Sequence, residues 1–221
     1  SVSESFLQKE KYYNVNVKGT ENIFQLAKEF EKKVVYASSS SIYGNTTTIP
    51  IQENFERNPI NPYGVTKLDD EKLAEKYHNL GVSIIGLRYF NVYGVGQTND
   101  YAGVITKFIN QINLNQSPII FGDGSQTRDF ISVEDVAKAN LLSMESNTDF
   151  SFLNIGTGIS TSVKTLAEVM IELSGKTLEI SYDDLPLGDV KESLADTSLA
   201  KKLINWNYDT FLKNGLKKFF F

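Results

Sequence analysis

Residues 34–67, which read VVYASSSSIYGNTTTIPIQENFERNPINPYGVTK, decide the fold class of this chain. The stretch opens on a short, apolar and β-branched run that four serines close, which is typical of a buried parallel strand. It ends on a Tyr and a Lys that follow the prolines of NPINP, and prolines in this position shape a loop that enters a helix. We therefore expect a strand, a loop and a helix in that order.

The rest of the chain repeats this alternation. Apolar residues at helical spacing predict helices over residues 16–33, 61–81, 101–116, 134–146 and 162–175. Short apolar runs predict one buried strand over residues 82–94 and further strands at residues 152–156 and 177–184. Strands that alternate with helices indicate an α/β fold with a mainly parallel sheet.

Composition excludes several classes of function. The 221 residues are 41% hydrophobic and 22% charged, with a net charge of −5, so no basic face for nucleic acid is expected. The sequence has no cysteine, so disulfides and thiolate metal sites are excluded. Its single histidine, His78, makes a histidine metal centre or a serine hydrolase triad improbable. No apolar run reaches membrane-spanning length and no signal peptide opens the chain, so we expect a cytoplasmic protein.

One segment imitates a dinucleotide fingerprint. A strand-like FLNIG runs into Gly156-x-Gly158 and a helix, and Asp183 ends the next expected strand. The third small position of the fingerprint is Thr161, whose branched side chain would obstruct close packing of helix on strand. We interpret this Gly-x-Gly as a tight structural turn.

Tyr63 and Lys67 are four residues apart on an expected helix, so they share one face. Tyrosine, with a reference pKa near 10, is a poor base at neutral pH, and a nearby ammonium favours the phenolate. The pair is therefore a candidate general base for a sugar or alcohol hydroxyl. The alternative is a surface Tyr and Lys at helical spacing, which for the pair alone is the better explanation.

The four serines before Tyr63 favour the catalytic explanation over the surface one. They end a buried strand at the carboxyl edge of the sheet, where open α/β sheets bind their ligands. A hydroxyl there could bond the same substrate oxygen as Tyr63. Serines in this position also cap helices and turns, so at most one of the four needs a chemical role.

Five motifs occur in the order found in one family: VVYASSSSIYG, NPYGVTK, LRYFNVYG, GDGSQTRDFISVEDVA and NIGTG. Over essentially its whole length, the chain resembles an extended short-chain dehydrogenase/reductase of the NAD-dependent epimerase/dehydratase family, in its UDP-glucose 4-epimerase-like group. The resemblance implies a Rossmann-like doubly wound parallel sheet and a smaller carboxyl-terminal substrate domain. It places the Rossmann part with the catalytic residues in 1–95 and mainly substrate binding in 96–221, with some segments returning to the Rossmann domain.

The resemblance also implies the cofactor NAD and a catalytic set of Ser39, Tyr63 and Lys67. Tyr63 would be the base, and Lys67 would bind the nicotinamide ribose and favour the phenolate. Ser40 and Ser41 would face elsewhere in the turn. On the cofactor side, the resemblance implies roles for Asn16, Tyr89 and Phe90. The alternatives are capping of the following helix for Asn16 and the end of a buried strand for Phe90.

On the substrate side, the resemblance implies that Asn91 holds the sugar nucleotide and that Arg128 clamps its diphosphate, for which forked guanidinium donors are suited. A structural ion pair of Arg128 with Asp129 or Glu134 is the alternative. Ser193 would leave room beside the 2-substituent of the sugar, or else lie in an exposed turn. Further residues that would enclose the nucleotide, or otherwise belong to the core, are Gly103, Val104, Ile120 and Phe121.

The sequence departs from the family pattern in two respects. The glycine-rich phosphate-binding unit and the acidic residue that reads the adenosine ribose are absent, so the chain resembles an amino-terminally truncated member, inactive alone. Pro186 stands where relatives have a second diphosphate arginine, and Lys191 is a candidate replacement.

The expected reaction is 4-epimerisation of a UDP-sugar, plain or N-acetylated, through a 4-keto intermediate in a homodimer. Ser40 and Ser41 occupy the positions where family dehydratases carry an acidic pair, which disfavours dehydration. Two alternatives stay open: a non-catalytic nucleotide-sugar-binding relative, and a reductase or dehydrogenase that releases its cofactor.

Overall fold

A three-stranded parallel sheet lies at the centre of the computed structural model, which describes residues 2–98, 103–184 and 190–220. Its order is β1 (Val34–Ser39), β2 (Ile84–Tyr89) and β7 (Phe150–Ile155). The register places Ser39 beside Tyr89, and Tyr89 beside Ile155. The carboxyl ends of all three strands therefore form one edge, and the expected α/β fold with a parallel sheet is confirmed.

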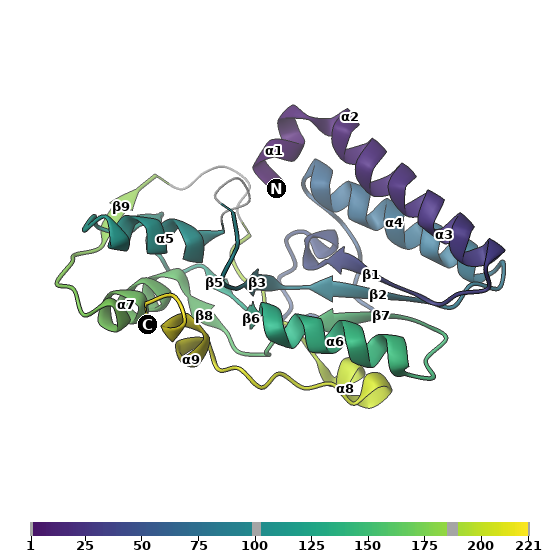
Figure 1. Ribbon diagram of the computed structural model, residues 1–221. Helices are drawn as coiled ribbons and strands as arrows, with labels where there is room; N and C mark the ends of the chain where they lie inside the picture. Colours follow the sequence, from purple (N-terminus) through teal and green to yellow (C-terminus); the bar gives the residue numbers. More distant parts are fainter. Residues whose placement is uncertain (1, 99–102, 185–189, 221) are drawn as a thin grey trace.

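Helices cover both faces of this sheet (Figure 1). The helices α3 (Gly19–Glu29) and α4 (Pro62–His78) lie on one face, and α6 (Val133–Glu145) and α8 (Ser198–Ile204) lie on the other. Neighbouring residues of β2 supply opposite faces: Ile84 packs with α3 and α4, whereas Ile85 packs with α6 and α8. A strand that is buried on both faces must be apolar throughout, which explains the continuous hydrophobic run.

The segment before α3 is helical but irregular. It consists of α1 (Val2–Leu7), α2 (Lys9–Tyr12) and a π-helix, η1 (Tyr13–Lys18), that continues into α3 without a break. Both short helices pack against α4. This segment therefore reaches the same region as the expected catalytic helix.

The single strand expected over residues 82–94 is wrong, because the chain forms two strands there. After β2, the short β3 (Asn91–Tyr93) leaves the central sheet and pairs in parallel with β6 (Phe130–Ser132). Phe90 is the junction; its amide still donates to the carbonyl of Ile155, and its side chain is buried. The apolar pattern is continuous across the junction, so it could not show the change of partner.

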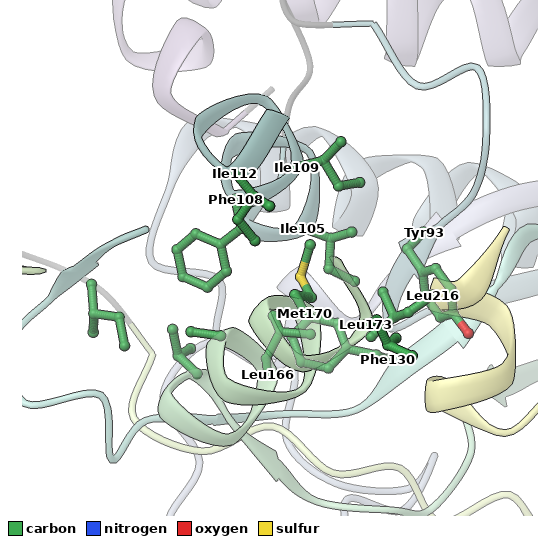
Figure 2. Packing of buried hydrophobic residues seen from close by; sticks show 13 residues of the cluster. Tyr93, Ile105, Phe108, Ile109, Ile112, Phe130, Leu166, Met170, Leu173 and Leu216 are labelled. Carbon is green, nitrogen blue, oxygen red and sulfur yellow. The ribbon is translucent and has the colours of Figure 1, made fainter. Parts of the chain in front are cut away.

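The remaining elements form a second layered region beside the sheet edge. It contains α5 (Val104–Asn113), α7 (Val163–Ser174) and α9 (Leu212–Lys217). Its strands are β4 (Ile119–Phe121), β5 (Thr127–Arg128), β8 (Thr161–Ser162) and β9 (Ser181–Asp183). Figure 2 shows Phe108 and Ile112 of α5 packed with Leu166 and Met170 of α7. Within the described ranges, no helix combines the length and the apolar character that crossing a membrane requires.

Candidate functional site

The serine turn joins the sheet edge to the site. Ser39 ends β1, and its hydroxyl caps the 3₁₀-helix η2 (Ser40–Tyr43) by accepting a hydrogen bond of 3.2 Å from the amide of Ser41. The two hydroxyls of Ser39 and Ser41 are also 3.1 Å apart and hydrogen-bonded. The expectation that Ser41 faces elsewhere is therefore wrong, because a turn this tight folds Ser41 back onto Ser39.

The start of α4 brings Tyr63 to this turn. Asn61 caps the helix by accepting a 2.8 Å bond from the amide of Gly64, and Pro62 occupies the first helical position. A Cβ on Gly64 would lie 2.7 Å from the carbonyl oxygen of Ser41, so only glycine allows this close approach. Tyr63 and the serine turn are thereby held as neighbours.

Ser5 of α1 also fixes the beginning of α4, a role that the sequence did not reveal. Its hydroxyl is fully buried and accepts a 3.1 Å hydrogen bond from the amide of Tyr63. The first amides of a helix have no partner within the helix, so a side chain from elsewhere in the fold can satisfy one of them. Ser5 thus links the amino-terminal segment to the backbone of Tyr63.

Lys67 bridges α4 and β1. Its ammonium donates one hydrogen bond of 3.0 Å to the carbonyl oxygen of Ala37 and another of 3.2 Å to Oδ2 of Asp70. Its side chain is 14% exposed, whereas that of Asp70 is fully buried. An ammonium has three N–H donors, so one of them is left for a ligand.

Asn16 lies beside this helix, not at a helix cap. Its side-chain amide donates a 2.9 Å hydrogen bond to the hydroxyl of Thr66, which in turn donates to the carbonyl oxygen of Tyr63. It stands inside η1, whereas the residue before α3 is Lys18, which makes no side-chain cap. The alternative that Asn16 caps the following helix is therefore wrong. Asn16 is connected to Tyr63 through one intermediate residue, Thr66.

A buried ionic network connects β1, β2, the serine turn and α4 next to the site. Arg88 of β2 makes a bidentate pair with Glu71 of α4, with N···O distances of 2.8 and 2.7 Å, and both side chains are buried. Ser38 donates to Glu71 at 2.7 Å, and the Tyr43 hydroxyl accepts from Arg88 at 2.7 Å. Burial raises the pKa of Tyr43 to about 12, against the lowering effect of Arg88. The network joins the strand end, the serine turn and α4 into one unit.

Tyr89 and Phe90 lie at the end of β2, and their side chains contact different parts of the fold. The hydroxyl of Tyr89 is hydrogen-bonded to the side chain of Asn140 on α6, with a distance of 3.0 Å to Oδ1. Burial raises the pKa of Tyr89. Phe90 packs in a small apolar cluster with Ile42 and Ala195, which agrees with the alternative that it belongs to the end of a buried strand.

A cavity of about 220 Å³ opens between the serine turn and the second region. Asn91 of β3, Arg128 of β5 and Ser193 all line it, together with Ser40 and Ser41. The other lining residues are Val2, Gly44, Ile51, Ile60, Asn61, Val190 and Glu192. Three residues that the resemblance assigned to the substrate thus meet in one cavity, although more than 100 positions separate Asn91 from Ser193.

Asp129 holds the wall of this cavity together. Its fully buried carboxylate accepts hydrogen bonds from the amides of Thr157 and Gly158, at 2.7 and 2.9 Å, and from the amide of Ala195 at 3.1 Å. Its carbonyl oxygen accepts from the amide of Asn91 at 2.9 Å. Burial raises the pKa of Asp129, although these donors oppose the shift. The carboxylate was not singled out from the sequence, because a lone Asp beside an Arg suggests an ion pair.

The same contacts explain the Gly-x-Gly turn. The amides of Thr157 and Gly158 bind the protein's own carboxylate, and a Cβ on Gly156 would lie 2.6 Å from Oδ2 of Asp129. In addition, β9 pairs with β4 and not with β7. The interpretation of this segment as a structural turn is confirmed.

Within the described residues, the structure does not show the ion pair of Arg128 with Asp129 or Glu134 that the sequence left open as an alternative. Asp129 is committed to the turn, and Glu134 pairs with Lys218 at 2.6 Å and bonds Ser132. Arg128 itself donates a 2.8 Å hydrogen bond to the carbonyl oxygen of Thr127.

The other expected substrate residues are not among those that line this cavity. Gly103 precedes α5 and Val104 begins it, whereas Ile120 is buried in the core and Phe121 is partly exposed on β4. Lys191 is exposed, and its carbonyl oxygen accepts from the amide of Thr127. Pro186 lies outside the described residues.

The chain is similar in sequence and in fold to several known proteins. A putative UDP-glucose 4-epimerase of Methanocaldococcus jannaschii is 42% identical over 209 residues, which are 93% of this chain and 68% of that protein. The UDP-N-acetylglucosamine 4-epimerase of Methanobrevibacter ruminantium, solved with UDP-N-acetylmuramic acid, has a TM-score of 0.95 at 35% identity, over 99% of this chain and 71% of its own. The UDP-glucuronic acid 4-epimerase of Bacillus cereus, solved with UDP-glucuronic acid and NAD, has a TM-score of 0.84 at 31% identity, over 91% and 65%.

The chain spans 62–69% of the length of the curated relatives that it matches. Residues 1–156 match the model of the NAD dependent epimerase/dehydratase family, which covers the serine turn, α4 and Asp129. By this match and by its similarity to the Methanocaldococcus protein, the chain belongs to the NAD dependent epimerase/dehydratase family.

Proposed function

We propose that the protein carrying this chain catalyses the NAD-dependent 4-epimerisation of a UDP-sugar. The observation that carries the proposal is the cavity in which Asn91, Arg128 and Ser193 meet the serine turn, next to the helix of Tyr63 and Lys67. The relatives named above act on UDP-sugars with different groups on the ring, and one of them was solved with both a UDP-sugar and NAD.

The residues around Lys67 fit the nicotinamide-ribose end of NAD. Lys67 has one N–H beyond the two that Ala37 and Asp70 occupy, and a ribose hydroxyl is a suitable acceptor for it. Asn16 is bonded to Thr66, the residue before Lys67, and is linked through it to the Tyr63 backbone. NAD held by these residues would supply the acceptor for the hydride at C4 of the sugar and the source for its return.

Proton movement falls to Tyr63 and Ser39. The Tyr63 phenolate, supported by the Lys67 ammonium, takes the proton of the sugar 4-hydroxyl, and the Ser39 hydroxyl bonds the same oxygen. The resulting 4-keto sugar turns in the cavity while Arg128 holds its diphosphate through charge-assisted bonds. Tyr63 then returns the proton to the oxygen, so the reaction shows no net oxidation.

Epimerisation is favoured over dehydration by the chemistry of the serine turn. Elimination of water needs an additional acid and base beside the sugar ring, and the cavity there presents the hydroxyls of Ser40 and Ser41. A serine hydroxyl is far less acidic than a carboxyl group, so it is a poor general acid or base at neutral pH. Ser193, small and at the cavity wall, leaves room for an acetamido group, so we include N-acetylated UDP-sugars among the substrates.

The proposal extends to assembly, domain roles and compartment. Ile23 and Leu26 of α3 and Phe30, which follows its last residue, are 53%, 49% and 61% exposed, and exposed apolar side chains of this kind suit a homodimer. We assign cofactor chemistry to residues 1–95 and mainly substrate binding to residues 96–221. The sequence contains no cysteine, which supports a reducing compartment such as the cytoplasm.

The test is an assay of the complete gene product with UDP-glucose, monitored by product separation and by absorbance of reduced nicotinamide. Epimerisation predicts UDP-galactose without net accumulation of reduced cofactor. Steady growth of the reduced-cofactor band would identify a dehydrogenase instead. Binding of UDP-glucose without any product would identify a non-catalytic relative.

A further inference from the structure

We propose that Asp70 is a positioning residue that fixes the Lys67 ammonium and moderates its charge beside Tyr63. The inference rests on the proposed function, because it gives Asp70 a part in the proton transfer assigned to Tyr63. It concerns a carboxylate for which the family resemblance predicted no role.

Asp70 is buried, and burial of an ionised carboxylate destabilises the folded state. It lies on α4, three residues after Lys67, and is fully buried. Oδ2 accepts the 3.2 Å hydrogen bond from Lys67, while Oδ1 makes no hydrogen bond of normal geometry within the described residues. The side chain of Thr20 on α3 is near enough to lower the pKa of this carboxyl, but burial outweighs its effect. A buried carboxylate oxygen without a partner destabilises a fold, so a purely structural role would be served better by an apolar residue.

The neighbouring carboxylate shows the contrast. Asp69 is partly exposed and pairs with Lys72 at 2.9 Å, as an ordinary surface ion pair on a helix. Asp70 instead faces the interior, towards the strand that carries the serine turn. The two residues provide a matched pair in which only one carboxylate reaches Lys67.

The contacts of Lys67 define what Asp70 does. With the Ala37 carbonyl and Asp70 on two of its donors, the ammonium is held between β1 and α4. Asp70 thus determines which way the remaining N–H points. Its negative charge also offsets part of the positive charge that favours the phenolate of Tyr63.

Other charged and titratable groups surround Asp70 without replacing it. On α4 they are Lys67, Asp69 and Glu71, and Glu71 is paired with Arg88 of β2. From β1, Tyr36 presents a buried hydroxyl, and burial keeps its pKa well above the ordinary value, so this group stays neutral. Asp70 is therefore the group in this surrounding whose charge changes near neutral pH.

Burial raises the pKa of Asp70 to about 6 from 3.8, although Lys67 opposes the shift. The folded state therefore binds this proton more tightly than the unfolded state does. The resulting stability is fully present below about pH 4 and is lost as the pH rises through 6. At neutral pH the carboxylate is ionised at the expense of stability, as expected for a group retained for function.

The experiment compares Asp70→Asn with Asp69→Asn in the complete gene product, with Asp70→Leu as a second variant that also removes the charge. Without the negative charge, the phenolate forms at lower pH, so the acid limb of the kcat profile should move down by about 0.5 pH unit or more in both Asp70 variants. Affinity for NAD, measured by calorimetry, should fall about threefold or more, because Lys67 loses its orientation. Asp69→Asn should change neither value.

Thermal unfolding provides a readout that does not depend on activity. The Asp70 variants should melt above the wild type at pH 8, and this gain should shrink at pH 5. An unmoved acid limb, an upward shift, or equal effects of Asp69→Asn would overturn the proposal, as would loss of folding in both Asp70 variants. A wild-type protein without epimerase activity would refute the proposed function instead, and the melting and NAD comparisons would still decide the role of Asp70.

Discussion

The ammonium of Lys67 on α4 donates a 3.0 Å hydrogen bond to the carbonyl oxygen of Ala37, two residues before Ser39 at the end of β1. This bond sets the distance between the helix that carries Tyr63 and the strand end that carries the serine. It crosses the packing interface between the helix that carries Tyr63 and the strand that Ser39 ends. The catalytic geometry therefore depends on packing as well as on the residues themselves.

Tyr63→Phe should abolish turnover while UDP-sugar binding persists, because only the group that transfers the proton is removed. General acid–base groups contribute about 10²–10⁴-fold, so kcat should fall by at least that order. Ser39→Ala should cost less, since it removes one hydrogen bond to the reacting oxygen. Steady-state kinetics and calorimetric binding of UDP-glucose provide the check. A Tyr63→Phe enzyme within a few-fold of the wild-type rate would eliminate the mechanism.

Glu71→Gln should destabilise the fold strongly, because it leaves the guanidinium of Arg88 buried without its countercharge. Loss of one partner of a buried pair costs about 3–5 kcal/mol. For a double-mutant cycle, Arg88→Met and Glu71→Leu are made singly and together, and the double variant should cost much less than the sum of these two single changes. Urea denaturation of the four proteins measures the cycle. Additive losses would show that the two groups do not act as a pair.

The sequence predicted a mainly parallel sheet, the five helices α3 to α7 and the position of Tyr63 on α4, because periodicity and local capping signals carry this information. It did not predict α8 and α9. It could not predict that β3 leaves the central sheet at Phe90, since apolar runs do not specify partners. It also missed Ser5, Asp129 and the Arg88–Glu71 pair. Each of these depends on contacts between segments far apart in the chain, and an isolated Ser, Asp or Arg in the sequence carries no signal of that kind.

Asp129→Asn should weaken UDP-sugar binding about tenfold or more and leave NAD affinity nearly unchanged. The carboxylate accepts from three amides, and an asparagine side chain can offer only one oxygen to them, so buried amides lose partners at roughly 1–3 kcal/mol each. Calorimetry with UDP-glucose and with NAD separates the two effects. Asp123→Asn, at an exposed turn in the same region, is the control. Equal losses for both ligands would show a general loss of folding instead of a cavity wall held by Asp129.

The 221-residue chain alone should bind NAD more weakly than micromolar. Cofactor pyrophosphate is normally held by the amides of a glycine-rich turn and a helix start. In this chain, the amides of the Gly-x-Gly turn already bind Asp129, and no other such unit occurs in the sequence. Titration calorimetry of the purified chain is the measurement. Micromolar affinity would mean that another part of the fold holds the pyrophosphate.

Ser193→Tyr should suppress conversion of N-acetylated UDP-sugars and leave the plain hexose reaction largely intact. Ser193 is nearly buried at the wall of the cavity, beside Glu192 and opposite the serine turn, so a tyrosine there would fill space that an acetamido group needs. In the wild type, the hydroxyl of Ser193 could donate a hydrogen bond to an acetamido carbonyl. Because a cavity that only tolerates an extra group discriminates weakly, the wild type should use both substrate pairs. The comparison is kcat/KM for UDP-glucose and UDP-N-acetylglucosamine, with Ser193→Ala as the control that keeps the space open and removes the hydroxyl. If the wild type converts UDP-glucose well and ignores the N-acetyl sugar, Ser193 does not control access to this site.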